Sequence, residues 1–510
     1  MNGALRALSD LLALATARVG ARVAARGIDV EQLAAHGLAQ LATEVEACRQ
    51  IADWAGRVGG EGPAAIACKF VDDVCQSIRA GVRLGPADHV GLEEMDLSAD
   101  DVRGLPGEAV DDAELARVGA CDPGLDADLA AMRAQFARFV DAEVRPVAQR
   151  IHLRNELVPI ELIEKLGALG VFGMTLPEEF GGLGLGKVAM CVVTEELTRG
   201  YIGVGSIGTR SEIAADLILR GGTEAQKRQW LPRIASGACL PTAVFTEPDH
   251  GSDLAGIRTR AVKQSDGSWR VTGQKTWSTH ATRADLMTIL ARTDPQEPGH
   301  AGLSMLLAPK TRRDDDFVDA GLSGTEIEVL GYRGMREYEL SFDGFHVPAE
   351  GLLGDREGLG FKQLMATFES ARIQTAARAV GVAQAALDEA ARYASERVQF
   401  GKRIAEFPRT LRKLGRMTVR VQAARQLTLH AARRKDSGDR CDLEAGMAKL
   451  LATQVAWECA DACVQIHGGN GYALEFAASR LLVDARVLSI FEGTSEIQAQ
   501  VIARRILEAR

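Results

Sequence analysis

The hydrophobic pattern of the chain predicts helices at both ends and strands between them. Apolar residues recur at helical spacing over residues 1–28 and 30–47, and again over 128–234. Four short runs ("SWRVTGQKTWSTH", "LMTILART", "LSMLLAP" and "YELSFDGFHVP") combine β-branched and aromatic residues with turn signals, which is typical of antiparallel strands in a sandwich or barrel. From Gly360 the helical pattern returns and continues almost to the C-terminus. These patterns predict a mainly α protein with a central antiparallel β domain.

Composition along the chain suggests where its domains begin and end. Residues 87–126 are acidic, poor in aromatic residues and interrupted by glycine and proline, which is typical of a linker. We therefore expect an N-terminal helical extension over 1–110, an acidic linker over 111–126, an α-helical domain over 127–240, a β domain over 241–355 and a C-terminal α-helical bundle over 356–510.

The first residues allow two interpretations. The stretch "ALRALSDLLALATARVGARVAARG" is amphipathic, rich in arginine and nearly free of acidic residues, as transit peptides are. It could equally form a surface helix of the mature protein. Because the helical pattern continues into residues 30–47, we expect residues 1–27 to be a structured helix that is retained.

Overall composition excludes several classes of function. The chain has 510 residues, of which 46% are hydrophobic and 25% charged, as in ordinary globular proteins. A net charge of −9 argues against a nucleic-acid partner, which would require a basic face. No apolar run is long enough to span a membrane. Nine cysteines without a CxxC pair indicate reduced core thiols in a cytoplasmic protein, and no metal site is expected.

A glycine cluster, "GGLGLG" at residues 181–186, invites comparison with a dinucleotide-binding fingerprint. It follows "LPEEF" rather than a strand and opens no βαβ unit. We interpret it as a loop.

The stretch "SIFEGTSEIQ" places Glu492 between Phe491 and the pair Gly493–Thr494. A carboxylate beside an aromatic ring and a turn glycine is either a helix cap or a chemical reagent. The residues after it have the pattern of a helix start, so the two roles are compatible.

Five motifs occur in a fixed order along the chain. They are "AVFTEPDHGSDLAGIRTRA", "GQKTWSTHA", "ERVQFGKRI", "QIHGGNGY" and "IFEGTSEIQ". Together they resemble the acyl-CoA dehydrogenase family of flavoproteins, over residues 125–507. The resemblance implies a helical domain, a β domain and a helical bundle, with the N-terminal helices as an extension. It also implies FAD as cofactor, an acyl-CoA thioester as substrate, electron transfer flavoprotein as electron acceptor, and a homodimer or homotetramer.

The same resemblance implies which residues bind FAD. Trp277 would offer an indole face and Thr279 a hydroxyl near flavin N5, although a core tryptophan on a strand is the alternative. Further contacts would come from Phe245, Thr246, Thr494 and Glu496, and, across a subunit boundary, from Arg397, Gln399, Phe400, Gln465, Gly468 and Gly469. Pro408 departs from the family, because many relatives have a glutamine there that touches the adenylate.

For the chemistry, the resemblance implies that Glu492 is the general base. It would remove the α-proton of the thioester, while its backbone N–H and a ribityl hydroxyl of FAD hold the thioester oxygen. Some branches place the base just before the arginine that matches Arg372, but this chain has Ala371 there. By the same matching, the substrate path is lined by Ser252, Phe361, Met365, Arg372 and Gly493. For Arg372, an ion pair with Glu369, three residues earlier on the same predicted helix, is the alternative.

Arg210 bears on the choice of acyl group. By matching, it lies at the end of the acyl cavity, where a dicarboxylate would present its second carboxylate. A salt bridge to Glu212 or Asp216 is the alternative. Further segments, such as "GTEIEVLGYRGMREYELSFDGF", and the N-terminal extension resemble those family members that oxidise (2S)-methylsuccinyl-CoA to mesaconyl-CoA in the ethylmalonyl-CoA pathway. We therefore expect FAD-dependent α,β-dehydrogenation of a short branched dicarboxylic acyl-CoA.

Other functions stay open at this point. A general short- or branched-chain acyl-CoA dehydrogenase would share the same motifs, and an acyl-CoA oxidase would pass electrons to oxygen instead. The DNA-associated branch of the family has basic surfaces, which the net charge of −9 does not support. The N-terminal 110 residues could also be a module for docking a partner.

Overall fold

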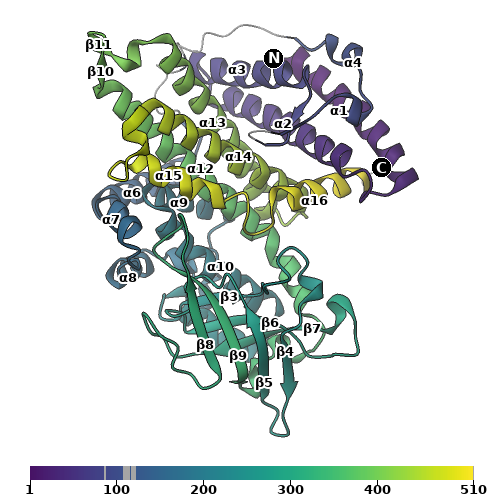
Figure 1. Ribbon diagram of the computed structural model, residues 1–510, viewed down its shortest axis with the longest axis vertical. Coiled ribbons are helices and arrows are strands. Elements are labelled where there is room, and N and C mark those ends of the chain that lie inside the picture. Colours follow the sequence, from purple (N-terminus) through teal and green to yellow (C-terminus); the bar gives the residue numbers. More distant parts are fainter. Residues whose placement is uncertain (86–87, 107–114, 116–121, 509–510) are drawn as a thin grey trace. The chain divides into compact units, whose positions relative to one another are not determined.

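The computed structural model describes residues 1–85, 88–106, 115 and 122–508. Most of the expected linker, residues 111–126, lies outside this set. The chain divides into two compact units, which are described separately (Figure 1). Met1–Arg138 together with Arg372–Arg510 form the helical unit, and Phe139–Ala371 form the sheet unit.

The helical unit combines helices from both ends of the chain. Its N-terminal part contains α1 (Asn2–Arg26), α2 (Gln32–Val58), α3 (Glu61–Ile78), α4 (Ala99–Arg103) and α6 (Ala127–Phe139), with the short strands β1 (Val82–Arg83) and β2 (His89–Val90). Its C-terminal part contains most of α12 (Gly360–Glu396), then α13 (Pro408–Asp436), α14 (Asp442–His467), α15 (Ala477–Val487) and α16 (Ser495–Glu508), with the hairpin β10 (Val398–Gln399) and β11 (Lys402–Arg403). Pro408 is the first residue of α13, a position where proline's fixed φ favours helix initiation.

The expected helix over residues 1–27 is present as α1. Its buried side chains, Leu8, Leu11, Ala15 and Val19, repeat at helical spacing and face α2. Arg18 donates a hydrogen bond of 2.7 Å to the Asp101 carboxylate. The interpretation as a structured surface helix is therefore confirmed, while its retention in the cell stays a prediction.

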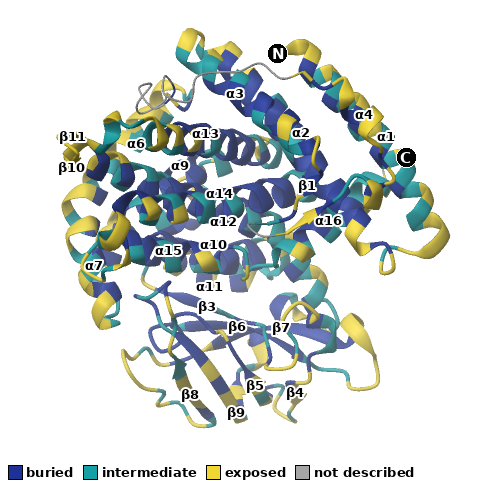
Figure 2. Ribbon diagram, turned by 45° about the horizontal axis from the view of Figure 1, so that its top comes forward, coloured by how far each residue is buried: buried dark blue, intermediate teal, exposed yellow. Residues whose placement is uncertain are grey.

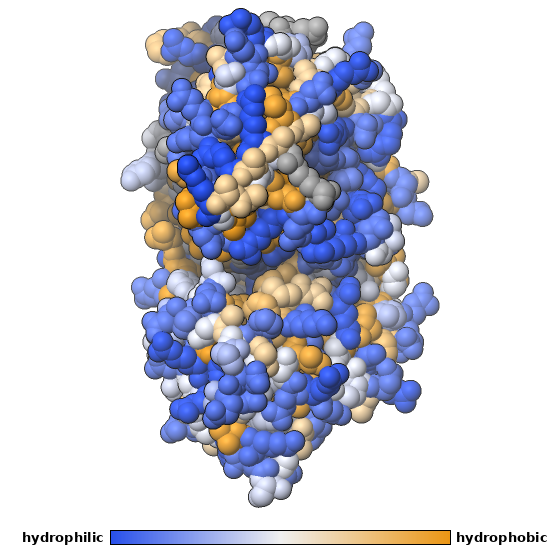
Figure 3. All heavy atoms as spheres, turned by 90° about the vertical axis from the view of Figure 1, so that its right-hand side faces the viewer, coloured by the Kyte–Doolittle hydropathy of each residue, from blue (hydrophilic) through white to orange (hydrophobic). Residues whose placement is uncertain are grey.

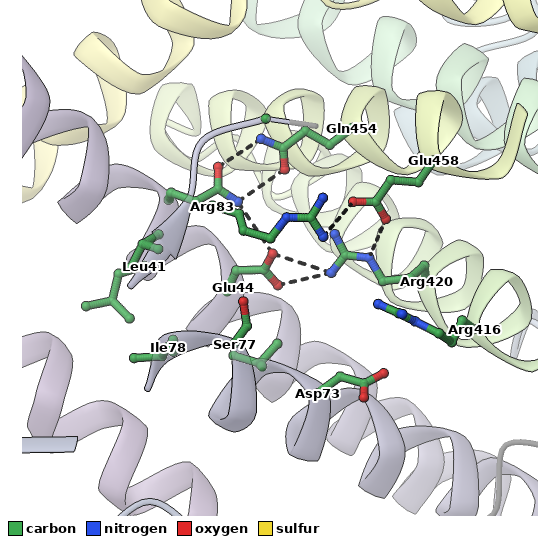
Figure 4. Close-up of a pocket in the computed structure, with 14 residues that line it drawn as sticks. Leu41, Glu44, Asp73, Ser77, Ile78, Arg83, Arg416, Arg420, Gln454 and Glu458 are labelled. Carbon is green, nitrogen blue, oxygen red and sulfur yellow. Dashed lines mark hydrogen bonds and ion pairs between the residues drawn. The ribbon is translucent and has the colours of Figure 1, made fainter. Parts of the chain in front are cut away.

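The N-terminal helices are part of the same core as the C-terminal bundle. Helix α2 packs against α13, α14 and α16, and Figure 2 shows these helices buried along much of their length. The half-buried Arg420 lies within 3.4 Å of Glu44 on α2 and 3.2 Å of Glu458 on α14 (Figure 4). Burial by itself would lower the pKa of Arg420, but these two carboxylates raise it above its ordinary value. A cavity of about 80 Å³ lies beside Arg420 and is lined by residues of α2, α3, α13 and α14.

The sheet unit consists of helices around a seven-stranded sheet. Its helices are α7 (Arg145–Arg154), α8 (Ile160–Ala168), α9 (Lys187–Gly200), α10 (Ile202–Gly221) and α11 (Glu224–Ala235). Its strands are β3 (Pro241–Val244), β4 (Arg260–Lys263), β5 (Trp269–Lys275), β6 (Leu286–Arg292), β7 (Leu303–Pro309), β8 (Leu322–Ile327) and β9 (Glu337–Val347). The strand order is β3-β6-β4-β5-β9-β8, and β7 pairs with β6. Neighbouring strands are mostly antiparallel, as expected, but β3 and β4 both run parallel to β6.

The apolar runs in β6 and β7 are explained by burial on both faces of the sheet. Leu286 and Leu290 face the core shared with α10 and α11, whereas Met287 and Ile289 face the core shared with β5, β8 and β9. Strand β9 instead alternates buried and exposed residues, because one of its faces meets solvent.

The described residues include no helix that combines the length and the apolarity needed to cross a membrane. The side of the molecule drawn in Figure 3 is largely hydrophilic, with hydrophobic residues in small groups.

Candidate active site

Glu492 lies in the loop of residues 488–494, between α15 and α16, which we call the Glu492 loop. Helix α16 begins at Ser495, and Thr494 provides its cap, because the Thr494 hydroxyl accepts a hydrogen bond from Ile497 N at 3.3 Å. The Glu492 side chain is therefore not required for capping. The role of the Glu492 carboxylate as a general base stays a prediction.

The Glu492 carboxylate meets two side chains from α12. Arg378 Nη2 lies 2.8 Å from Glu492 Oε2, and the Thr375 hydroxyl donates to the same oxygen. Thr375 and Arg378 are three residues apart, so they share one face of the helix. Arg378 is fully buried and its guanidinium lies over the Phe491 ring at 4.8 Å, whereas 13% of the Glu492 side chain is exposed. The carboxylate is thus held by a fixed cation while it keeps access to a ligand.

Lys449 on α14 binds the same loop through the backbone. Its ammonium donates to the carbonyl oxygens of Phe491, at 2.8 Å, and of Gly493. Burial lowers the pKa of Lys449 to about 7, an effect opposed by Glu492 and increased by Arg372 and Arg378.

Several charged groups around Glu492 act on Lys449. They are the cations Arg372 and Arg378 and the carboxylates Glu492 and Glu496.

The expected cofactor residues of the helical unit form a second, exposed group. Arg397, Gln399 and Phe400 lie on or beside the β10–β11 hairpin, and Phe400 is 94% exposed. Gln465, Gly468 and Gly469 lie at the C-terminal end of α14, and a Cβ at either glycine would meet no other atom within 4 Å. Tyr393 joins the two places, because its hydroxyl accepts a hydrogen bond of 3.0 Å from Asn470. The backbone at these glycines is open to close approach by a ligand.

In the sheet unit, four expected cofactor residues lie at one end of the sheet. Phe245 and Thr246 follow β3, and Trp277 and Thr279 follow β5. Thr276 N donates to Thr246 O at 2.9 Å, which joins the two segments. Trp277 is 55% exposed and lies outside the strand, so the alternative of a core tryptophan on a strand is wrong. An exposed indole is available for stacking against a flat ring.

Arg210 is connected to this group through Glu337 on β9. The Thr279 hydroxyl donates to both Glu337 carboxylate oxygens, at 2.9 and 3.0 Å, and Arg210 Nη2 lies 3.4 Å from the Tyr332 hydroxyl. Burial raises the pKa of Glu337 to about 8, although Arg210 and Thr279 both act to lower it.

The two carboxylates named as alternative partners of Arg210 are bound to other cations. Glu212 pairs with Lys187, and Asp216 pairs with Arg220 at 2.7 Å. Neither needs Arg210 for its neutralisation.

The remaining substrate-path residues are distributed over the sheet unit. Phe361 and Met365, at the start of α12, pack with Phe245 against the core that the sheet shares with α10 and α11. Ser252 lies on an exposed loop.

Four residues of these groups were missed by the sequence analysis, namely Thr375, Arg378, Lys449 and Glu337. For Arg378 and Lys449, the available signal was a single cation inside an otherwise apolar helical run, in "TAARAVGVA" and "GMAKLLA" respectively. Such a cation must be paired when the helix is buried, but the sequence does not name its partner.

The buried Glu337 makes stability depend on pH. Below pH 4.5 its carboxyl is protonated in both the folded and the unfolded chain, and as pH rises toward 8 only the unfolded chain releases the proton. The free energy of unfolding therefore falls over this range. We expect Glu337→Gln to remove this loss, so that the variant gains roughly 1–4 kcal/mol relative to the wild type between pH 5 and pH 8. Urea denaturation at several pH values measures the gain.

A matched control is Glu339→Gln, two residues further along β9 and exposed. It should leave the pH dependence of unfolding as in the wild type. A Glu337→Gln gain that is the same at pH 5 and pH 8 would contradict the assignment of Glu337.

Comparison with known proteins gives a consistent picture across the chain. Three family models match successive segments: "Acyl-CoA dehydrogenase, N-terminal domain" at residues 126–238, "middle domain" at 242–345 and "C-terminal domain" at 358–507. A (2S)-methylsuccinyl-CoA dehydrogenase of Cereibacter sphaeroides is 54% identical over 515 residues, covering 96% of this chain and 93% of the relative. The match therefore includes the N-terminal helices.

Solved structures agree with this result. Butyryl-CoA dehydrogenase of Megasphaera elsdenii has a TM-score of 0.71 at 32% identity, covering 76% of this chain and 100% of its own. A glutaryl-CoA dehydrogenase of Mycobacterium smegmatis, solved in complex with FADH2, has a TM-score of 0.68 at 31% identity, covering 75% of this chain and 95% of its own.

Proposed function

Because the chain belongs to the acyl-CoA dehydrogenase family, we propose that it is an FAD-dependent enzyme that converts (2S)-methylsuccinyl-CoA to mesaconyl-CoA. The enzyme is an oxidoreductase acting on acyl-CoA. The observation that carries the dicarboxylic substrate is the 54% identity to (2S)-methylsuccinyl-CoA dehydrogenase, which covers 96% of this chain.

The residues of the chain suit FAD. Trp277 offers an exposed aromatic face, Thr279 and Thr246 offer hydroxyls beside it, and Gly468 and Gly469 allow the backbone to approach a pyrophosphate. FAD held by these residues would supply the acceptor for the hydride that leaves the β-carbon of the substrate.

Glu492 performs the proton transfer in this proposal. Its carboxylate takes the α-proton of the thioester, which is a weak acid and therefore needs a positioned base. Arg378 and Thr375 hold one carboxylate oxygen and fix the direction of the other. The Glu492 N–H binds the thioester oxygen, on which negative charge develops as the proton leaves.

The length of the substrate restricts where its free carboxylate binds. A succinyl skeleton has only two carbons between its carboxyl groups, so the free carboxylate lies roughly 2.5 Å from the α-carbon. It must therefore lie close to the proposed base, Glu492. Arg210 stays our proposed contact for this carboxylate, and its contribution is separable from that of Arg378 by mutation.

Partners and location belong to the same proposal. Electron transfer flavoprotein is the proposed acceptor, as the family resemblance implies, and the cytoplasm is the proposed location. A second copy of the chain, in a dimer or tetramer, is the proposed partner of the exposed surface that includes Phe400, Val398, Tyr472 and Leu474. Large exposed hydrophobic side chains in one region favour contact with another protein surface.

An activity screen tests the proposed function. Purified protein is assayed with C4 to C6 acyl-CoAs, with and without a terminal carboxylate, using a ferrocenium-type dye as acceptor. We expect methylsuccinyl-CoA to give the highest kcat/KM and the reaction in air to form little peroxide. Equal or faster turnover of a neutral branched acyl-CoA would favour a general short- or branched-chain dehydrogenase, and stoichiometric peroxide would favour an oxidase.

A further inference from the structure

The backbone of the Glu492 loop has an unusual conformation at the proposed base. Glu492 has a φ of +53° and Gly493 a φ of +88°. The left-handed region disfavours a residue with a side chain, and such residues persist only where their surroundings hold them. Something in the fold must therefore fix this loop.

Lys449 is the group that holds the loop on both sides of Glu492. Its Nζ donates to Phe491 O at 2.8 Å and also to Gly493 O, the carbonyls that precede and follow the Glu492 residue. Lys449 lies within α14, away from its ends, and its side chain is buried, with 1% of the residue exposed. A buried ammonium bound to two carbonyls of one short segment fixes the orientation of both peptide planes.

Peptide geometry connects this contact to the reaction. The peptide unit is planar, and in its trans form the C=O and N–H groups point in opposite directions. No cis peptide bond occurs among the described residues. Because the Phe491 carbonyl points at Lys449, the Glu492 N–H of the same unit points away from Lys449. A cation on the carbonyl oxygen also polarises the unit and strengthens its N–H as a donor.

We propose that Lys449 is a positioning residue for the reaction: by binding the Phe491 and Gly493 carbonyls, it orients and polarises the Glu492 N–H that receives the thioester oxygen. This inference rests on the proposed function, in which that N–H faces the thioester. Lys449 itself touches neither the substrate nor the reacting atoms. Its effect is to stabilise the enolate-like charge that develops when the α-proton leaves.

Ionisation of a bound ligand tests the role of Lys449 without requiring turnover. The probe is 3-oxobutanoyl-CoA, whose acidic α-carbon forms an enolate with its own ultraviolet absorbance. It is titrated with pH on the FAD-bound enzyme and on FAD-bound Lys449→Met, which has a similar length and no donor. We expect the variant to hold at least tenfold less enolate at a given pH, and its kcat to fall by roughly 10–100-fold with a smaller change in KM.

Two further Lys449 variants keep the test decisive if Lys449→Met folds poorly. Lys449→Gln keeps hydrogen-bond donors without the charge, and Lys449→Arg keeps both. The fraction of enolate should decrease in the order wild type, Arg, Gln, Met. If every Lys449 variant that retains FAD ionises the probe as the wild type does, the proposal is wrong.

Lys310→Met is the matched control for removing a buried lysine. Lys310 also donates to backbone carbonyls, those of Thr282, Ala284 and Thr311, but it lies in the sheet unit. This variant should lower the melting temperature while leaving the ionisation of the probe unchanged. An equal shift in Lys310→Met would assign the effect to general loss of stability and overturn the proposal.

Failure of the proposed function has a different result. If the wild-type holoenzyme neither binds the probe nor oxidises any acyl-CoA, the assignment of Glu492 as base is wrong as well. If the wild type binds the probe and oxidises an acyl-CoA, and the Lys449 variants do so equally well, the proposed function stands and the role of Lys449 is refuted.

Discussion

Glu492→Gln is expected to lower kcat by ~10²–10⁴-fold or more, while the protein keeps its FAD and still binds CoA esters. The amide is nearly isosteric with the carboxylate, and its oxygen can still accept from Arg378 and Thr375, so the loop should keep its conformation. The amide cannot accept the α-proton, and the thioester's weakly acidic α-carbon has no other carboxylate matched to this role. Stopped-flow measurement of flavin reduction by the substrate isolates this step.

The matched control is Glu508→Gln, which removes an exposed carboxylate at the other end of α16. It should reduce flavin at the wild-type rate. If Glu492→Gln also does so, the base lies elsewhere in the chain and the inference from the family resemblance fails at this residue.

Arg210→Leu is expected to lower kcat/KM for methylsuccinyl-CoA by roughly 10²–10³-fold. A carboxylate that enters a largely apolar cavity loses its hydration, and a guanidinium can bind both of its oxygens in return. Removing one partner of a buried pair costs ~3–5 kcal/mol, which corresponds to this range at ~1.4 kcal/mol per factor of ten. Turnover of the uncharged analogue 2-methylbutanoyl-CoA should stay the same or improve.

Arg378→Leu is the informative comparison. Arg378 binds the proposed base, and in our proposal it also lies near the free carboxylate. Its loss should therefore lower kcat/KM for both substrates. If Arg210→Leu lowers kcat/KM for both substrates together, Arg210 is structural. If Arg210→Leu lowers kcat/KM for neither substrate, the cations of the helical unit bind the carboxylate by themselves.

Tyr338 and Arg333 are further candidates for this carboxylate, and the structure gives both of them protein partners. The Tyr338 hydroxyl lies 3.0 Å from the Thr282 hydroxyl, and Arg333 donates to the carbonyl of His152 at 2.9 Å. They are tested only if neither arginine variant changes the substrate preference.

Local sequence patterns were sufficient for most of the secondary structure. The helical period predicted α1 and the long C-terminal helices, because a helix that packs on a core repeats its apolar residues every three or four positions. Alternation predicted β9, where one face is buried and the other is solvated. The parallel pairing of β3 and β4 with β6 was missed, because paired residues lie far apart in the sequence (45 residues for β3 and β6) and pairing direction has no local signature.

The sequence by itself determined the family, the order of helices and strands, and Glu492 as the candidate base, because each depends on residue types at short spacing. Only the tertiary structure decided which distant groups meet. It brought Arg378 within 2.8 Å of Glu492, 114 residues away, and placed the Lys449 ammonium on the loop that carries this carboxylate. It also packed α2 against α13, α14 and α16, so that both ends of the chain share one core. Such contacts follow from how buried charges and apolar faces are satisfied by packing across the whole chain, and a local pattern does not contain that information.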